Sequence, residues 1–348
     1  MKKPSTLLRS FSSRLSTRLA PSPAVAPWPP VRSAYDRWLA AELDELRADP
    51  LAPCTSAAWL SRALGLAVAA QRRLVASASE TATTTAGIDR KTVDECVEDT
   101  AELLDACAGI RDRLDMLRSY VTATRIALHW LEGHGGGEAA GARRAAAAFA
   151  ECEAVERRCG ADLAKCGSNL RKLGERALLH ATRQLPAGAA HHQDDEELSG
   201  ARALALLAVG ALGAALAFRP RRAVSGLAHR AAGGGKPVGQ WECELQEVQR
   251  RVREEYDRRR KDGVPCMAEL DAAVAAGRGV RCAVAGGRRC PEILAADARR
   301  RCDDLEETVA AFEEKVGELQ RELIAVRMVL LERARRARGH ELLRLPRI

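Results

Sequence analysis

Apolar residues recur every three or four positions through two long stretches of the chain. In 295–330 this spacing persists for about five heptads, which is the pattern of a helix that buries one stripe. The members of this stripe are Ala295, Ala298, Cys302, Leu305, Val309, Phe312, Val316, Leu319, Leu323, Val326 and Leu330. A matching stripe in 93–128 consists of Val93, Cys96, Thr100, Leu103, Cys107, Ile110, Leu114, Leu117, Val121, Thr124 and Leu128. Two stripes of similar length predict helices that pack together within one chain, with a coiled coil between chains as the alternative.

Helical spacing extends through most of the remaining sequence. Helices are predicted at 35–79 (two short helices split by "ADPLAPCTS"), at 140–184, at 240–261 and, shorter and broken by glycine, at 262–291. Alanine and leucine supply most of the apolar residues, whereas aromatic residues make up only 3%. Alanine and leucine favour helices, and aromatic and β-branched residues favour strands. The predicted fold is therefore all-α, an elongated helical bundle of long antiparallel helices with a C-terminal heptad helix.

Composition divides the chain into four parts. Residues 1–34 form a basic tail rich in Ser and Arg, predicted to be disordered, in which "APSPAVAPWPP" breaks any helix. Residues 35–184 are predicted to form an N-terminal helical bundle, and "LPAGAAHHQDDEELSG" at 185–200 a linker. Residues 201–348 contain an apolar helix and the heptad helix, which is predicted to pack back on the bundle.

The apolar run "ALALLAVGALGAALAF" at 203–218 has two interpretations, a membrane span and a buried helix of the bundle. Sixteen helical residues rise about 24 Å, against about 30 Å for the hydrocarbon core of a bilayer. Arginines follow the run, so a span would require the first 200 residues to cross the membrane. These observations favour a buried helix, and the span stays open as the alternative. Gly210 and Gly213 permit close helix packing in either setting.

The net charge of +8 is concentrated in the tail. Six basic residues and no acidic ones lie there, namely Lys2, Lys3, Arg9, Arg14, Arg18 and Arg32. Such a tail is typical of a transit peptide, of a disordered arm, or of an amphipathic helix at 7–19 lying on an anionic membrane. Because the charge lies in a tail and few aromatic residues are present to stack on bases, nucleic acid is disfavoured as a partner.

The sequence offers no catalytic motif: GxSxG, HExxH, a GxGxxG after a strand and paired-cysteine zinc spacing are all missing. His129, near a helix end, and His180, in "ALLHATRQL", are interpreted as packed or rim histidines rather than general bases. The glycine-rich segment with Lys236 lacks the spacing of a phosphate-binding loop. No catalytic, cofactor-binding or metal-binding residue is predicted, and no cofactor.

Cysteine and histidine clusters receive structural interpretations. The 11 cysteines are odd in number and include no CxxC pair, which favours reduced, buried thiols in an intracellular protein. Cys152, Cys159 and Cys166 are spaced by sevens, and seven helical residues rise about 10 Å, too far for sulfurs to share one ion. The cluster of His191, His192, Asp194 and Asp195 is interpreted as a solvated loop, with adventitious metal binding as the alternative.

Two segments resemble the plant BYPASS family of helical proteins. They are "AAWLSRALGLAVAAQRRLV" (57–75) and "VDECVEDTAELLDACAGIRDRLDMLRSYVTATRIALHWLEG" (93–133). The likeness rests on Trp59 in a "WLSRAL" helix start, on the acidic helix with Leu103 to Cys107, and on the end of that helix, from Ala127 to Glu132. A small-residue apolar segment followed by a C-terminal heptad helix is also similar to the family. The likeness is weakest at 185–200 and 231–290.

The resemblance implies a non-enzymatic plant developmental regulator that restrains a root-derived mobile signal and so supports root and shoot development. The alternative is a membrane-peripheral coiled-coil adaptor linked to secretion or tethering. Protein partners are expected to bind through helical surfaces, with membrane contact through 7–19 and 203–218 as a further expectation. The expected location is intracellular, cytoplasmic or peripheral to membranes, with the chloroplast or endoplasmic reticulum membrane as the alternative.

Overall fold

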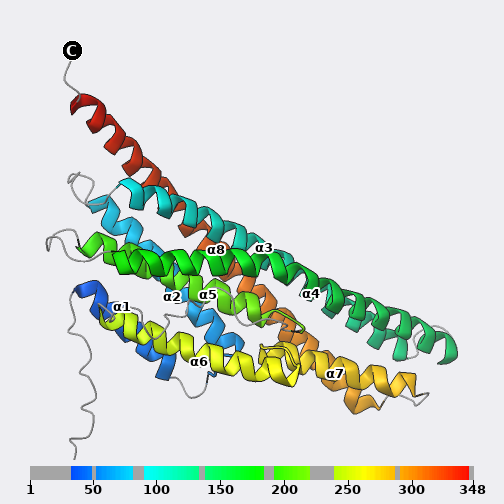
Figure 1. The fold of residues 1–348 in the computed structure, drawn as a ribbon. Helices are drawn as coiled ribbons and strands as arrows, with labels where there is room; N and C mark the ends of the chain where they lie inside the picture. The colour runs from blue at the N-terminus through cyan, green and yellow to red at the C-terminus, as the bar shows by residue number, and fades with distance from the viewer. Residues whose placement is uncertain are drawn as a thin grey trace, which may run out of the picture.

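The computed structural model describes residues 33–48, 52–80, 90–132, 138–183, 192–219, 239–286 and 291–344. Within these ranges the chain forms α-helices and no strands, which confirms the predicted all-α fold. The helices are α1 (Ala34–Ala48), α2 (Ala57–Glu80), α3 (Arg90–Leu131), α4 (Glu138–Arg183), α5 (His192–Ala215), α6 (Gln240–Asp262), α7 (Ala268–Ala285) and α8 (Glu292–Arg344). The long helices lie nearly side by side and give the bundle its elongated shape (Figure 1).

Helix α3 lies between α4 and α8, and the three make the most extensive contacts in the bundle. Ion pairs join the end of α3 to the start of α8, as between Glu132 and Arg299, and the middle of α3 to the middle of α8. Near the start of α3, Arg327 Nη1 donates to the Val97 carbonyl oxygen at 2.6 Å. This order of contacts shows that α3 and α8 run antiparallel, as the bundle prediction requires.

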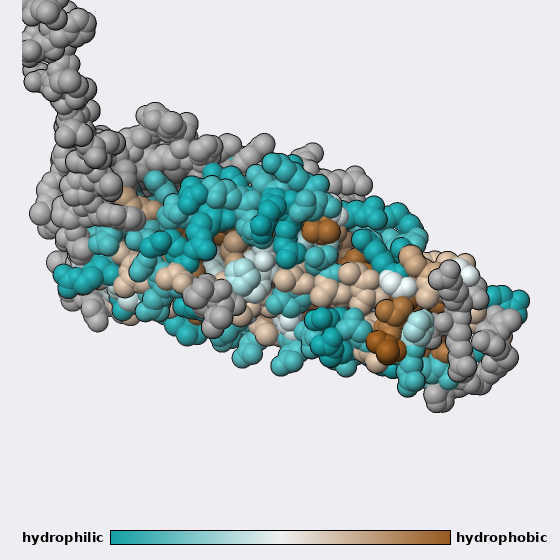
Figure 2. All heavy atoms as spheres, turned by 90° about the horizontal axis from the view of Figure 1, so that it is seen from below, coloured by the Kyte–Doolittle hydropathy of each residue, from teal (hydrophilic) through white to brown (hydrophobic). Residues whose placement is uncertain are grey.

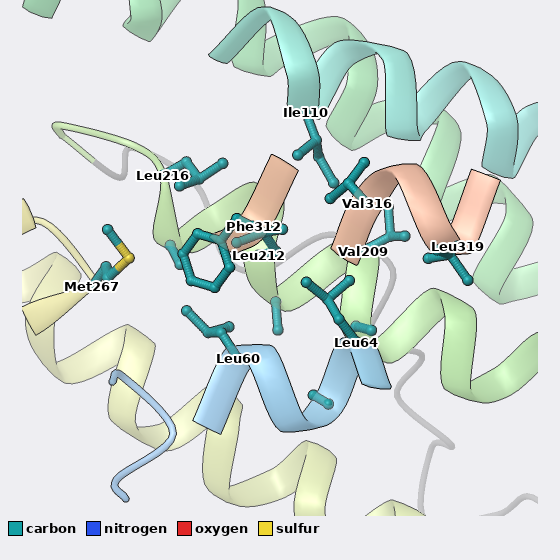
Figure 3. Packing of buried hydrophobic residues seen from close by; sticks show 14 of the residues in the cluster. Leu60, Leu64, Ile110, Val209, Leu212, Leu216, Met267, Phe312, Val316 and Leu319 are labelled. Carbon is teal, nitrogen blue, oxygen red and sulfur yellow. The ribbon is translucent and has the colours of Figure 1, made fainter. Parts of the chain in front are cut away.

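The heptad stripe of α8 is buried along its whole length from Ala295 to Leu330. Figure 3 shows Phe312, Val316 and Leu319 among Leu60 and Leu64 of α2, Ile110 of α3, and Val209 and Leu212 of α5. The prediction that the stripe packs within one chain is confirmed. Its partner is broader than the 93–128 stripe, because α8 also packs on α2.

The apolar run lies in α5, in the interior of the bundle. Glu196–Ala215 is long and apolar enough to cross a membrane by length and composition, with a mean hydropathy of 1.6, and 78% of that stretch is buried inside the protein. Helix α5 begins at His192, so 192–200 is helical where the sequence predicts a linker. The acidic residues 194–197 fall in the first turns, where the helix dipole favours negative charge. Residues 185–191 lie outside the described part of the chain.

Short polar contacts fix the helix ends. Helix α2 is capped by Ser56, whose Oγ accepts from the Trp59 amide at 3.2 Å. Helix α6 has no cap from its own preceding residue; instead the buried carboxylate of Asp36 on α1 accepts from the Trp241 amide at 2.9 Å. Gly263 ends α6 in the left-handed conformation with φ of 70°, which favours glycine. The tail predicted at 1–34 falls almost entirely outside the described residues.

Candidate functional site

A buried arginine of α3 contacts the C-terminal end of the apolar helix α5. Arg113 is only 3% exposed, and its Nη1 donates to the Gly213 carbonyl oxygen at 2.8 Å. Gly213 lies in the last turn of α5, where carbonyl groups lack intrahelical partners and carry partial negative charge. A Cβ atom at Gly213 would lie 3.1 Å from Arg113 Nη1, so the glycine leaves room for the guanidinium. Arg113 therefore caps α5 from a neighbouring helix.

A second polar contact between α3 and α5 is the ion pair of Asp99 with Arg202, whose side chains are both largely buried. Beside it, Gln71 Nε2 of α2 donates to the Ala201 carbonyl oxygen at 2.8 Å. A cavity of about 20 Å³ is lined by Gln71, Asp99 and Arg202, with Thr100 among others. That volume holds about one water molecule, whereas ligand pockets measure several hundred Å³. The arrangement fixes the three helices against one another.

Two further cavities between the described helices are smaller still, about 10 Å³ each. One lies among Leu74, Leu198 and Val326, and the other beside Trp59 and Cys54. Among the residues that the structure describes, no three His, Cys, Asp or Glu side chains are placed to hold a metal ion. Each of these three cavities between described helices is thus about the size of one water molecule.

The cysteines spaced by sevens point to different partners. Cys152 Sγ lies 3.4 Å from Thr124 Oγ1, whereas Cys159 Sγ lies 3.7 Å from the Leu216 carbonyl oxygen. Both are buried, and burial raises the pKa of the Cys152 thiol. They belong to a buried stripe, as the sequence indicates; the side chain of Cys166 lies outside the described residues.

Of the histidines discussed from the sequence, the structure describes the side chain of His129. His129 is exposed and packs edge-on against Trp130, with ring centroids 5.6 Å apart. The side chains of His180, His192, Asp194 and Asp195, together with residues His191 and Lys236, lie outside the described part. Their predicted interpretations stay predictions.

Helix α8 has exposed apolar side chains that do not belong to its heptad stripe. Ile324 and Met328 of α8 are 51% and 61% exposed, and they share one face with the half-buried Leu331. The signal was present as a second 4–3 spacing outside the heptad stripe, at 324, 328 and 331. On α3, Val97 and Leu104 are half-buried. We refer to Val97, Leu104, Ile324 and Met328 together as the outer seam.

Charged pairs line the rest of the boundary between α3 and α8. Arg118 is hydrogen-bonded to Glu313 across it, and Arg125 pairs with both Asp303 and Glu306. The hydrogen bond from Arg118 lowers the pKa of the Glu313 carboxyl group. Since these pairs are exposed, each contributes little to stability, and their main effect is to set the register.

Most of the face seen in Figure 2 is hydrophilic, and its apolar side chains form small, separate groups. Exposed large apolar residues in the described part are few; besides Ile324 and Met328 they are Ile126, Ile293 and Leu294. The described part of the chain therefore defines a class of protein, an elongated all-α bundle with charged helix surfaces. No protein-family model, curated protein or solved structure matches this chain.

Proposed function

We propose that this chain is a non-enzymatic regulator that acts by binding other proteins through its helix surfaces. The observation that carries the proposal is the small size of the three cavities that lie between described helices. Arg113 is hydrogen-bonded to a neighbouring helix, and Asp99 and Arg202 form an ion pair between helices. The cavity beside that ion pair admits about one water molecule. The surfaces available to bind a partner are the long, exposed faces of the helices.

The biological role that we propose is that of a BYPASS-type plant developmental regulator, restraining a root-derived mobile signal and so supporting root and shoot development. Its support is the resemblance of 57–75 and 93–133 to that family, and both segments lie in the core helices α2 and α3. Trp59 is buried in α2, with Nε1 donating to the Leu46 carbonyl oxygen at 2.9 Å. The resembling residues thus include ones that hold helices together, which is consistent with a shared scaffold.

Genetic complementation tests this role. The chain is expressed in a plant that lacks BYPASS function, and restored shoot growth is the expected result. A variant unfolded by Leu319→Asp and Leu323→Asp should fail to restore growth, whereas Ile293→Asp, at an 82% exposed position, should restore it. Arrested shoots despite abundant folded protein would contradict the proposed role.

The second candidate is a membrane-peripheral adaptor linked to secretion or tethering. The observation that favours it is the span-like composition of α5, although that helix is largely buried. In this case membrane contact would fall mainly on 7–19, since α5 is engaged by α2, α3 and α4. Deleting residues 1–22 distinguishes the two: an adaptor would leave the membrane fraction, and a soluble regulator would keep its distribution.

A further inference from the structure

The ion pair between α3 and α5 leaves a buried donor of the arginine unused. Arg202 Nη2 contacts Asp99 Oδ2, and the two side chains are only 11% and 4% exposed. Arg202 Nε is shielded from solvent and has no hydrogen-bond partner among the residues that the structure describes. A buried N–H group without an acceptor costs free energy, and such groups are rare in native proteins. An acceptor for Arg202 Nε is therefore expected close by.

The cavity beside this ion pair has the size and polarity that a water molecule needs. Its volume is about 20 Å³, whereas a buried water needs roughly 10–15 Å³ and about two to four polar partners. Polar residues of three helices line it, namely Gln71 of α2, Asp99 and Thr100 of α3, and Arg202 of α5. Thr100 Oγ1 donates to the Val97 carbonyl oxygen at 2.8 Å, so the lone pairs of that hydroxyl can accept a hydrogen bond.

We propose that this cavity binds one ordered water molecule. The water accepts a hydrogen bond from Arg202 Nε and donates to acceptors of α3, the Thr100 hydroxyl and the Asp99 carboxylate. It joins α5 to α3 beside the direct ion pair, next to the hydrogen bond from Gln71 of α2 to the Ala201 carbonyl oxygen. The water is a part of the packing of these helices, and its presence does not depend on the proposed regulatory role.

The charges of the lining favour water over an ion. Asp99 and Arg202 are the charged residues that line the cavity in the described part of the chain, and their charges cancel. A cation would be repelled by the guanidinium and an anion by the carboxylate, whereas water can bond to both groups. The volume is also far below the several hundred Å³ of a pocket for an organic ligand.

A neighbouring cavity provides a comparison inside the same bundle. It measures about 10 Å³ and shares Leu74, Leu198 and Val326 with the first cavity. Apart from Arg333, its described lining is apolar. A cavity at the lower size limit with apolar walls stays dry, because a water molecule inside it would lose hydrogen bonds. We therefore expect water in the cavity beside the ion pair and none in this one.

A high-resolution crystal structure of the full chain is the first test. A water molecule should lie about 2.7–3.2 Å from Arg202 Nε and from Thr100 Oγ1 or an Asp99 carboxylate oxygen. Crystals soaked in bromide distinguish water from an anion, since bromide scatters anomalously and would replace a bound chloride. A direct bond from Arg202 Nε to a protein atom, no water beside it, or bromide in the cavity would each overturn the proposal.

A substitution tests the site in solution. Thr100→Ile removes the hydroxyl and adds a methyl group at the wall of the cavity, so the water should be displaced. Thr308→Ile is the matched control, because Thr308 Oγ1 likewise donates to a carbonyl oxygen of its own helix, that of Asp304 at 2.8 Å, away from the cavity.

Oxygen-17 magnetic relaxation dispersion counts the water molecules that stay inside a protein for longer than it takes to tumble. The count should fall by about one in Thr100→Ile and keep the wild-type value in Thr308→Ile. Circular dichroism shows that both variants are folded. An unchanged count in folded Thr100→Ile would contradict the proposal, and if that variant does not fold, the crystal structure of the wild type decides.

Discussion

The heptad stripe of α8 makes one prediction with a large expected effect. Leu319 and Leu323 are fully buried against the other core helices. Replacing a buried leucine with alanine costs about 2.7–5 kcal/mol, and aspartate adds the cost of burying an unpaired polar group, about 1–3 kcal/mol or more. Leu319→Asp with Leu323→Asp should therefore cost about 7 kcal/mol at the least, within the 5–15 kcal/mol that holds a typical domain together.

The double variant should lose its cooperative structure rather than separate into folded subunits. Circular dichroism and urea unfolding at low protein concentration measure this, with Ile293→Asp as the control on the same helix, expected to change the free energy of unfolding by less than about 0.5 kcal/mol. A single Leu323→Ala should lower the free energy of unfolding by about 3 kcal/mol and remain measurable. A folded, monomeric double variant would refute the reasoning, because it would mean that the stripe faces another chain.

The contacts at helix ends and thiols give three further predictions. Gly213→Val should destabilise the protein by about 1–3 kcal/mol in urea unfolding, since the new side chain displaces the Arg113 guanidinium from its carbonyl partner. Asp36→Ala should cost about 1–2 kcal/mol by removing the cap of α6, as measured by thermal unfolding. Iodoacetamide should alkylate the exposed Cys282 early, whereas Cys302 should remain unmodified at about pH 8, because burial raises its pKa to about 12 and keeps it protonated; mass spectrometry of the folded protein reads both.

The two substitutions have control variants within the same chain, and the alkylation experiment has an outcome that would contradict it. Asp44→Ala, which removes an exposed carboxylate from α1, should be nearly neutral where Asp36→Ala is not. Gly279 has open space where a Cβ would stand, so Gly279→Ala should cost little or add stability to α7. Rapid alkylation of Cys302 in the native protein would show that α3 and α8 separate readily.

Features with a local period could be predicted from the sequence. The stripe from Ala295 to Leu330 repeats along one helix, so its burial follows from spacing alone, and every member is buried in the structure. The start of α5 was wrongly placed, because the polar residues after His192 suggest a loop when taken by composition. Their acidic character fits a helix N-terminus equally well.

The polar contacts inside the bundle could not be predicted from spacing. Arg113 belongs to the long helix α3, and nothing around it in sequence marks it as buried. Its partner, Gly213, is 100 residues away, and the pairing depends on how α3 and α5 cross. The same holds for Asp36, which caps a helix 205 residues further along the chain. Such contacts can be identified only from the tertiary structure, because the sequence around each residue gives no sign of its distant partner.

The position of α5 can be judged by comparing two free energies. Insertion of 203–218 into a bilayer gains about 2–4 kcal/mol from its Leu, Val and Phe residues. Leaving the bundle would expose the faces that now cover it, including the fully buried Leu64, Ile110 and Val316, each worth about 1.5–3 kcal/mol on burial.

The bundle also supplies a hydrogen-bond donor for the end of α5, which the hydrocarbon core of a bilayer lacks. In lipid, the last carbonyl groups of α5 would need water or headgroups, whereas here Arg113 donates to one of them from within the protein. Withdrawing α5 would remove that acceptor and leave a buried cation without it, a further cost. The balance therefore favours the docked helix. Carbonate extraction of membranes from cells expressing the full chain should release the protein into the supernatant, and recovery in the pellet would show that a bilayer outcompetes the bundle for this helix.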